Sequence, residues 1–194
     1  NNRCSFTREL MAELENINRF TEQALYYARS EHTEKDYSVR EIRLSDVVHG
    51  AIADSKYLLR QNNVAITVDD MEYSIYSDDK WVRLILDQII SNVIKYRTGH
   101  PILHLFAVKE NERVVLSVED NGIGIPQSDL PRIFEKGFTG QNGRTIHSST
   151  GIGLYLCKRL CDKLGIGIAA RSEGKGTIIS LSFHINDFVT GVQG

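Results

Sequence analysis

Apolar side chains near the start of the chain are spaced by multiples close to 3.5 residues. They are separated by polar and charged side chains and occupy Leu10, Leu14, Ile17, Leu25 and Ala28. This spacing predicts one face of a long helix, with an apolar stripe too narrow to be stable without a partner helix. The helix could pack on its own domain or form half of a hairpin or dimer stalk. The polar linker predicted at residues 30–41 favours the hairpin.

Beyond residue 40, alternating apolar residues and helical spacings follow one another along the chain. Strands are predicted at 40–44, 64–68, 73–76, 102–108, 113–120, 166–171 and 177–185. Helices are predicted at 45–61, 78–96 and 152–164, the first capped by Ser45 and ended by Asn62 and Asn63, the second opened by Asp78 or Asp79. This order predicts an α+β fold, a mixed sheet with helices on one face.

Residues 126–150 contain few apolar side chains and many Gly, Ser and Thr residues. The segment is therefore predicted to be a long loop. A loop of this length inside a compact domain usually has a function.

Composition excludes several classes of protein. The formal net charge of -2 marks no nucleic-acid or membrane surface, and neither a membrane-spanning run nor a signal peptide is expected. The three cysteines form no disulfide framework, which fits a reducing compartment. Cys157 and Cys161 lie one helical turn apart and could be metal ligands. Because no Cys or His follows at a useful spacing, buried free thiols are expected instead.

Asp120 ends a predicted strand and begins the stretch DNGIGIP. The apolar residues on one face of that strand are Val114, Leu116 and Val118. Asp120 has the same parity, so its carboxylate should point to the buried side, where it needs hydrogen-bond donors. Gly122 and Gly124 allow the backbone to turn toward a ligand. Two interpretations remain open: Asp120 binds the exocyclic amine of a flat heterocycle, or it caps local amides in a turn.

Polar side chains follow one face of the second predicted helix, at Gln88, Asn92, Lys95 and Tyr96. One interpretation is a strip that faces solvent. However, Asn is a poor choice for an exposed helix interior. Its side-chain oxygen can bind a hard divalent cation, and Lys95 could meet a phosphate.

Glycines precede the last predicted helix, at Gly151 and Gly153. The apolar face of this helix is formed by Leu154, Cys157, Cys161 and Leu164. Glycines at a helix N-terminus expose backbone amides and the positive end of the helix dipole to phosphate. A further stretch, GKGT, leads into the final strand and places Thr177 where its hydroxyl could join Asp120 through water.

Together these stretches resemble the nucleotide-binding domain of bacterial sensor histidine kinases, whose superfamily includes gyrase B, mismatch-repair ATPases and the heat-shock chaperone ATPase. QIISNVIKY resembles the N box, DNGIGI the G1 box, IFEKGF the F box, TGIGL the G2 box and GKGT the last glycine motif. The resemblance covers about residues 40–186 and implies a Bergerat-type two-layer α/β sandwich, preceded by an N-terminal helix. LYYARSEHTEKDY and DDKW are similar to the peptide-antibiotic-sensing membrane kinases.

The resemblance also implies a role for individual residues, with ATP and Mg²⁺ as cofactors. It implies that Asp120 binds the adenine amine, that Asn92 binds magnesium and that Lys95 lies near phosphate. Residues from about 127 to 149 would form a mobile lid. The implied ATP-binding residues are Asn92, Lys95, Tyr96, Asp120, Gly122, Gly124, Ile125, Phe138, Gly151, Gly153, Leu154 and Thr177.

The sequence departs from the family pattern in two places. The phosphoacceptor motif, a His followed by an acid and a few residues later by a Pro, is found at none of the six histidines. The N-terminal helix therefore resembles the second helix of the dimerisation hairpin, with the first helix and its His absent from this sequence. Many relatives carry an Arg shortly after the F box, and here only Arg144 is a candidate for the γ-phosphate.

The expected organisation is a hairpin helix and linker at 1–38, a catalytic ATP-binding domain at 39–187 and a tail at 188–194. The expected function is transfer of the ATP γ-phosphate to a His on the missing helix. The expected partners are a second copy, joined through the N-terminal helix, and a response regulator, without nucleic acid. The expected location is the cytoplasmic side of a bacterial cell membrane, attached only through segments absent here.

Two rival functions are considered. ATP hydrolases of the superfamily activate water with a Glu four residues before the magnesium Asn. Position 88 is Gln, which cannot accept a proton at neutral pH. This residue also argues against the anti-sigma serine kinases of the superfamily. A non-catalytic nucleotide-binding scaffold is excluded least well, because the motifs indicate binding and not turnover.

Overall fold

The computed structural model describes residues 38–145 and 150–185, without the side chains of Arg144 and Thr145. The helix expected in the first 30 residues lies outside the described residues, and so does the tail expected at 188–194. Within the described part, no helix combines the length and apolar character that crossing a bilayer requires.

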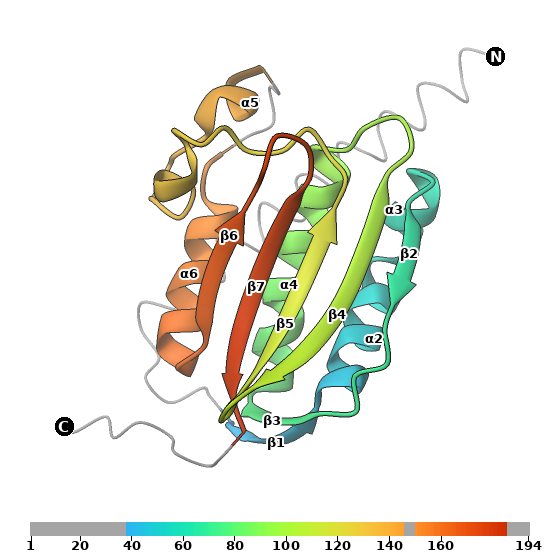
Figure 1. Ribbon diagram of the computed structural model, residues 1–194, viewed down its shortest axis with the longest axis vertical. Helices are drawn as coiled ribbons and strands as arrows, with labels where there is room; N and C mark the ends of the chain where they lie inside the picture. The colour runs from blue at the N-terminus through green and yellow to red at the C-terminus, as the bar shows by residue number, and fades with distance from the viewer. Residues whose placement is uncertain (1–37, 146–149, 186–194) are drawn as a thin grey trace. The chain divides into compact units, whose positions relative to one another are not determined.

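A five-stranded mixed sheet forms one layer of the fold (Figure 1). Its strands, in spatial order, are β2 (Ala65–Val68), β4 (Ile102–Glu110), β5 (Arg113–Asp120), β7 (Thr177–His184) and β6 (Gly167–Arg171). β2 runs parallel to β4, and the other neighbouring pairs are antiparallel. A separate antiparallel ribbon lies at the lower end of the domain in Figure 1 and is formed by β1 (Arg40–Arg43) and β3 (Ser74–Ser77).

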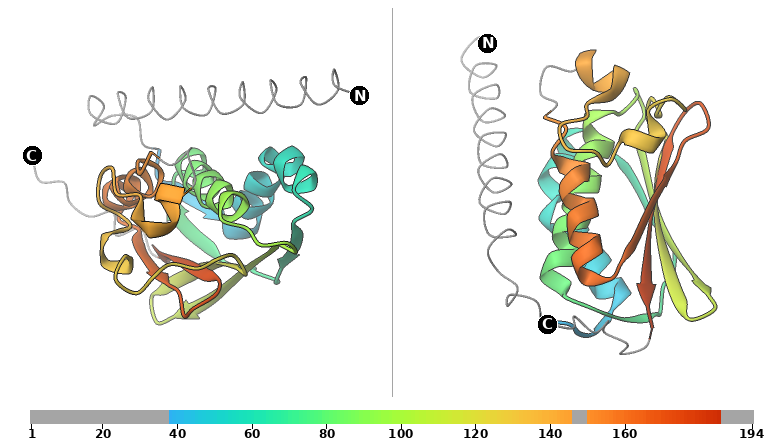
Figure 2. Two further views of the ribbon diagram at one scale, coloured as in Figure 1. Left: turned by 90° about the horizontal axis from the view of Figure 1, so that it is seen from above. Right: turned by 90° about the vertical axis from the view of Figure 1, so that its left-hand side faces the viewer.

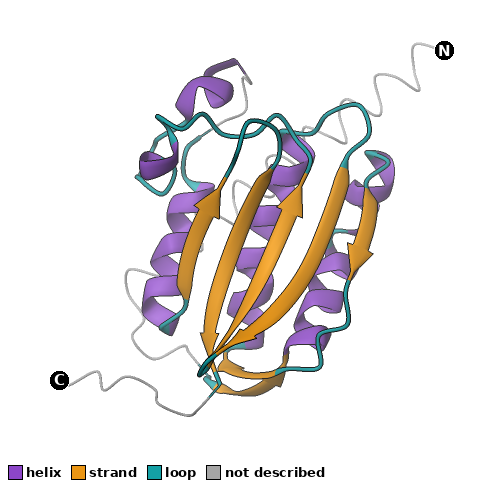
Figure 3. Ribbon diagram, viewed as in Figure 1, coloured by secondary structure: helices purple, strands orange, loops and turns teal. Residues whose placement is uncertain are grey.

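The helices form the second layer and cover one face of this sheet, as Figures 2 and 3 show. They are α2 (Leu44–Asp54), the short α3 (Lys56–Gln61), α4 (Asp79–Lys95) and α6 (Gly153–Leu164). Alternate strand residues point to the helices and are buried, among them Leu103, Leu105, Val114, Leu116, Val118, Ile179, Leu181 and Phe183. Burying such a side chain contributes about 1.5–3 kcal/mol. The predicted α+β fold, a mixed sheet with helices on one face, is confirmed.

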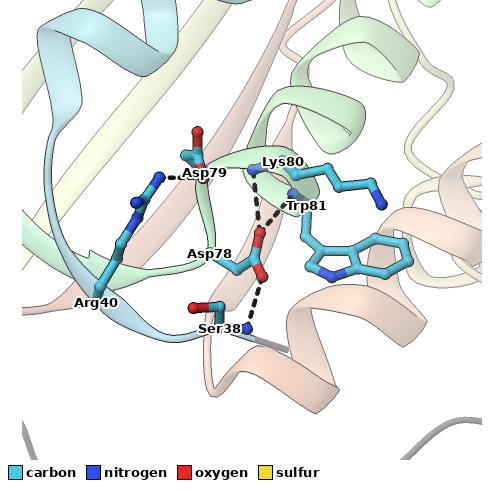
Figure 4. Close-up of polar contacts among 6 residues, drawn as sticks. All are labelled: Ser38, Arg40, Asp78, Asp79, Lys80 and Trp81. Atoms are coloured by element: carbon cyan, nitrogen blue, oxygen red, sulfur yellow. Dashed lines mark hydrogen bonds and ion pairs between the residues drawn. The ribbon is translucent and has the colours of Figure 1, made fainter. Parts of the chain in front are cut away.

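Of the two residues that the sequence offers for the start of α4, Asp78 is the cap and Asp79 is the first residue of the helix. Asp78 Oδ1 accepts hydrogen bonds from the backbone N–H groups of Lys80 at 3.1 Å and Trp81 at 3.3 Å. Asp78 Oδ2 accepts one from the backbone N–H of Ser38 at 2.8 Å (Figure 4). Asp78 is only 5% exposed, so these donors satisfy a carboxylate that would otherwise be costly to bury.

The first predicted helix is wrong in two respects. It is broken at Ser55 into α2 and α3, and it begins one residue early, so that Ser45 lies inside α2 and does not cap it. The cause of the early start is tertiary. The backbone N–H of Leu44 donates to the carbonyl of Tyr73 at 2.9 Å, which connects the start of α2 to the residue before β3. The predicted end of α3 at Asn62 is confirmed.

Up to residue 145, where the description of this segment is interrupted, the loop predicted at 126–150 contains two short helical elements, η1 (Leu130–Arg132) and α5 (Gly140–Thr145). Between them, the side chain of Ile133 is buried. β4 and β5 pair antiparallel as a hairpin, and β4 continues to Glu110, beyond the strand predicted at 102–108. Its turn therefore contains only Asn111 and Glu112, with Asn111 in the left-handed region at φ 55°, which Asn tolerates better than most residues.

Candidate functional site

A cleft lies where the end of β5 and the start of β7 meet the C-terminal half of α4. Most of its lining is apolar, contributed by Ile89, Val93, Ile125, Pro126, Ile133, Phe138, Leu154 and Ile179. The polar side chains in the lining are those of Asn92, Tyr96, Asp120, Asp129, Thr139, Asn142 and Thr177. A mostly apolar cleft with a few convergent polar groups is typical of a small-molecule site.

Asp120 lies at the end of β5, directly opposite Thr177 on β7, and both residues line the cleft. The Asp120 Oδ1 atom accepts a hydrogen bond from the backbone N–H of Gly122 at 2.7 Å. Burial raises the pKa of Asp120, while the backbone hydrogen bonds from Gly122 and Thr177 oppose this rise. The two interpretations of Asp120 are therefore compatible, because the carboxylate bonds a local amide and also faces the cleft.

The predicted polar strip on α4 divides at its C-terminal end. Asn92 and Tyr96 line the cleft. Lys95 is not in the lining, and its Nζ lies 5.6 Å from the centre of the Tyr96 ring. Gln88, one turn before Asn92, packs on Gly153, the first residue of α6. A Cβ added at Gly153 would lie 2.4 Å from Gln88 Nε2. A side chain at position 153 would therefore displace the amide group of Gln88.

Gly122 and Gly124 are required by close contacts with neighbouring backbone. A Cβ at Gly122 would lie 2.6 Å from the carbonyl oxygen of Tyr96, and one at Gly124 would lie 2.3 Å from that of Gly174. Gly124 has φ +75°, a conformation that glycine adopts without strain. Of the two, only Gly124 lines the cleft, so the predicted approach to a ligand applies to Gly124.

The residues predicted around α6 divide in the same way. Phe138 and Leu154 line the cleft, but Gly151 and Gly153 do not. Gly151 has φ +66° and packs on Gly137. The backbone N–H of Gly137 donates to the carbonyl of Gly151 at 3.0 Å. The side chain of Arg144 lies outside the described residues.

Several lining residues were missed in the sequence. Ile179 and Thr177 are two positions apart on β7, so strand parity could have found Ile179. Asp129 gave no local signal. It is 9% exposed, and its Oδ2 accepts a hydrogen bond from the backbone N–H of Gln141 at 2.8 Å. The side-chain Nδ2 of Asn142 donates to the carbonyl of Gly124 at 2.8 Å. Through Gln141 and Asn142, α5 is therefore connected to two parts of the cleft.

The chemistry of the cleft fits an adenine nucleotide. Its apolar side chains suit a flat base, Asp120 suits an exocyclic amine, and the oxygen of Asn92 suits a hard cation. No group of three or more His, Cys, Asp or Glu residues in the described part of the chain could hold a metal ion.

Cys157 and Cys161 are free and buried, as predicted. Burial raises the pKa of the Cys157 thiol well above its ordinary value and that of Cys161 to about 12. Both thiols therefore stay protonated at neutral pH and belong to the core, not to the cleft.

Comparisons with known proteins agree with this fold and site. The family model of histidine kinase-, DNA gyrase B- and HSP90-like ATPases matches residues 77–187. The sensor histidine kinase YxdK of Bacillus subtilis is 35% identical over 179 residues, which cover 90% of this chain and 55% of that protein. The chain thus spans about half the length of the curated relatives it matches.

Solved structures show the same fold at low sequence identity. The histidine kinase AdeS of Acinetobacter baumannii has a TM-score of 0.72 at 19% identity, covering 93% of this chain and 84% of that chain. The histidine kinase ThkA, solved in complex with the response regulator protein TrrA, has a TM-score of 0.70 at 17% identity, covering 91% of this chain and 49% of that chain. Because the family model covers more than half of the sequence, the chain belongs to the family of histidine kinase-, DNA gyrase B- and HSP90-like ATPases.

Proposed function

We propose that this chain is the ATP-binding kinase unit of a two-component sensor histidine kinase. It would transfer the γ-phosphate of ATP to a His on a dimerisation helix that this sequence does not contain. The observation that carries the proposal is the meeting of Asp120, Thr177 and Asn92 in one apolar cleft of a chain from this family. The similarity to YxdK, a sensor histidine kinase, supports the kinase in preference to other members of the family.

Individual residues have the following roles in the proposal. Asp120 accepts from the exocyclic amine of adenine, and Ile125, Phe138 and Leu154 pack against the base or sugar. Asn92 contributes an oxygen ligand to Mg²⁺, whose other ligands are phosphate oxygens and water.

The phosphates would lie toward the N-terminus of α6, where the backbone amides and the helix dipole favour anions. Lys95 Nζ lies 5.6 Å from the centre of the Tyr96 ring. To reach the phosphates, the Lys95 side chain would leave this position. Arg144 remains the candidate for the γ-phosphate.

The rival hydrolase function lacks a general base at the position where hydrolases of the superfamily carry Glu. Gln88 occupies that position and lies against Gly153 at the start of α6. A hydrolase would need a carboxylate at position 88 to accept a proton from water. A non-catalytic scaffold would bind the same nucleotide without transferring phosphate, and only an assay of transfer separates it from the kinase.

The proposed partners follow from the same assignment. A response regulator receives the phosphoryl group from the acceptor His, and the crystal structure of ThkA in complex with the response regulator protein TrrA is an example of such a pairing in another kinase. Dimerisation through the N-terminal helix supplies the acceptor. In a longer sensor, this unit would lie on the cytoplasmic side of the cell membrane, and nucleic acid has no role.

Radiolabelled ATP and Mg²⁺ test the proposal. The chain alone and the chain extended to include the first hairpin helix are incubated with [γ-³²P]ATP, with Asp120→Asn of the extended chain as a matched control. We expect an acid-labile label on the extended chain only, reduced by the substitution. ATP binding without label on the extended chain would favour the scaffold, and rapid release of phosphate would favour the hydrolase.

A further inference from the structure

Ser172 follows β6 and begins the turn that leads to β7. It is 4% exposed and is not in the lining of the cleft. Its hydroxyl accepts a hydrogen bond from the backbone N–H of Ile125 at 2.8 Å and donates one to the carbonyl of Gly176 at 2.6 Å. One buried hydroxyl thus joins two separate segments, each of which continues into the cleft.

The first of these segments forms a wall of the cleft, to which Gly124 and Ile125 both contribute. A Cβ at Gly124 would lie 3.0 Å from the Ser172 Oγ atom, so the hydroxyl is in close contact with this backbone. The side-chain amide of Gln127 also donates to the Ser172 carbonyl. Ser172 therefore determines how closely residues 124–127 approach the turn between β6 and β7.

The second segment leads to the carboxylate of Asp120 through successive hydrogen bonds. The Ser172 hydroxyl donates to the Gly176 carbonyl, and the Gly176 N–H donates to the Gly122 carbonyl at 2.9 Å. The Gly122 N–H then donates to Asp120 Oδ1 at 2.7 Å. Gly176 also precedes Thr177, the strand partner of Asp120. The orientation of Asp120 therefore depends on where the Gly176 backbone lies.

We propose that Ser172 is a positioning residue for recognition of the purine base. It holds the Ile125 wall and the Asp120 carboxylate at a fixed separation, and it thereby favours a purine with an exocyclic amine over one without it. Ser172 does not touch the nucleotide in this proposal, which rests on the proposed binding of ATP. Removing its hydroxyl leaves the half-buried Ile125 N–H and the buried Gly176 C=O without this partner, so both segments must shift to find other partners.

The test compares ATP with purine riboside triphosphate, which lacks the exocyclic amine, by titration calorimetry. The unmodified protein should bind ATP more tightly. In Ser172→Ala we expect the affinity for ATP to fall about tenfold while that for purine riboside triphosphate changes little, so that the ratio of the two falls about tenfold. Ser172→Cys retains a group of similar size with a weak donor and acceptor. The ratio of its two affinities should lie between that of the unmodified protein and that of Ser172→Ala.

Ser117→Ala is the matched control. Ser117 is 6% exposed on β5, and its hydroxyl contacts that of Ser180 at 3.2 Å, away from the cleft lining. This substitution removes a hydroxyl of similar burial from β5 of the same domain. The loss of this buried hydroxyl should lower the melting temperature, yet leave the ratio of the two affinities unchanged.

The outcomes separate this inference from the proposed function. An unchanged ratio in Ser172→Ala, or an equal loss for both nucleotides, would overturn the positioning role. Failure of the unmodified protein to bind ATP would instead refute the proposed function. If circular dichroism shows that Ser172→Ala does not fold, Ser172→Cys takes its place. Rapid hydrogen exchange of the Ile125 amide in the unmodified protein would by itself contradict the role assigned to the hydroxyl.

Discussion

The carboxylate of Asp78 accepts a hydrogen bond from the backbone N–H of Ser38, 40 positions earlier in the chain, at 2.8 Å. Its other oxygen accepts from the backbone N–H groups of Lys80 and Trp81 in the first turn of α4. One buried side chain therefore connects the first described residue to the N-terminus of the helix whose C-terminal half lines the cleft.

Asp78→Ala should lower the free energy of unfolding by about 0.5–2 kcal/mol, the range for loss of a helix cap. The same substitution also leaves the Ser38 amide without its acceptor. Asp79→Ala is the control. It keeps the cap and removes an exposed first-turn carboxylate that pairs with Arg40 at 2.9 Å, and such an exposed pair contributes about 0–1 kcal/mol. Urea denaturation of both variants checks the prediction, and an equal loss in the two would contradict the capping role.

Asp120→Asn should weaken ATP binding about 10- to 150-fold, because a hydrogen bond to a charged group is worth about 1.5–3 kcal/mol. Titration calorimetry measures the affinity. An affinity equal to that of the unmodified protein would refute the assignment of Asp120 to the base.

The same variant should be more stable than the unmodified protein when no nucleotide is bound. Burial raises the pKa of Asp120 above 3.8, so the folded state holds this proton more tightly than the unfolded state. Stability consequently falls as pH rises from the unfolded pKa through the folded pKa, and it stays lower above that window. Asn removes this cost and can still accept from the Gly122 amide. Thermal unfolding at pH 7 should therefore show a higher melting temperature, and a lower one would contradict the stated cause.

Asn92→Ala should weaken binding of ATP with magnesium by about tenfold, while metal-free binding changes by less than about threefold. The difference arises because the proposed contact of Asn92 is with the metal. Calorimetry with and without Mg²⁺ gives the two values. Ser91→Ala, on the same helix but outside the lining, should change neither, and equal losses in Asn92→Ala under both conditions would count against the metal role.

His104 should make stability depend on pH above its ordinary pKa of 6.5. Its Nε2 lies 3.1 Å from Asp69 Oδ1 and its Nδ1 lies 3.4 Å from Glu119 Oε2. The hydrogen bond to Asp69 is the largest cause that raises the pKa of His104, and burial opposes it. The contribution to stability is complete below 6.5 and is lost as pH rises through the raised pKa.

Urea denaturation at a series of pH values from about 6 to 9 measures this loss. His104→Gln should flatten the dependence over this range, and Asp69→Asn should reduce it. The same slope in His104→Gln as in the unmodified protein would show that another group titrates there.

The sequence by itself determined the features that are encoded locally. The alternation of Val114, Leu116 and Val118 showed which face of β5 is buried and placed Asp120 on that face. The sequence also limited the start of α4 to Asp78 or Asp79 and indicated the helix end at Asn62, because side chains at such positions interact with the backbone within a few residues. The glycine motifs identified the family because their spacing is a property of the chain alone.

Only the tertiary structure decided which of the predicted residues meet. Lys95 and Tyr96 are neighbours in the sequence, yet only Tyr96 lines the cleft. The early start of α2 depends on a hydrogen bond from Leu44 to Tyr73, and the role of Ser172 depends on one from Ile125, 47 positions away. Such contacts join segments that are distant along the chain, and local periodicity carries no record of them. Their geometry exists only after the strands have paired and the helices have packed on the sheet.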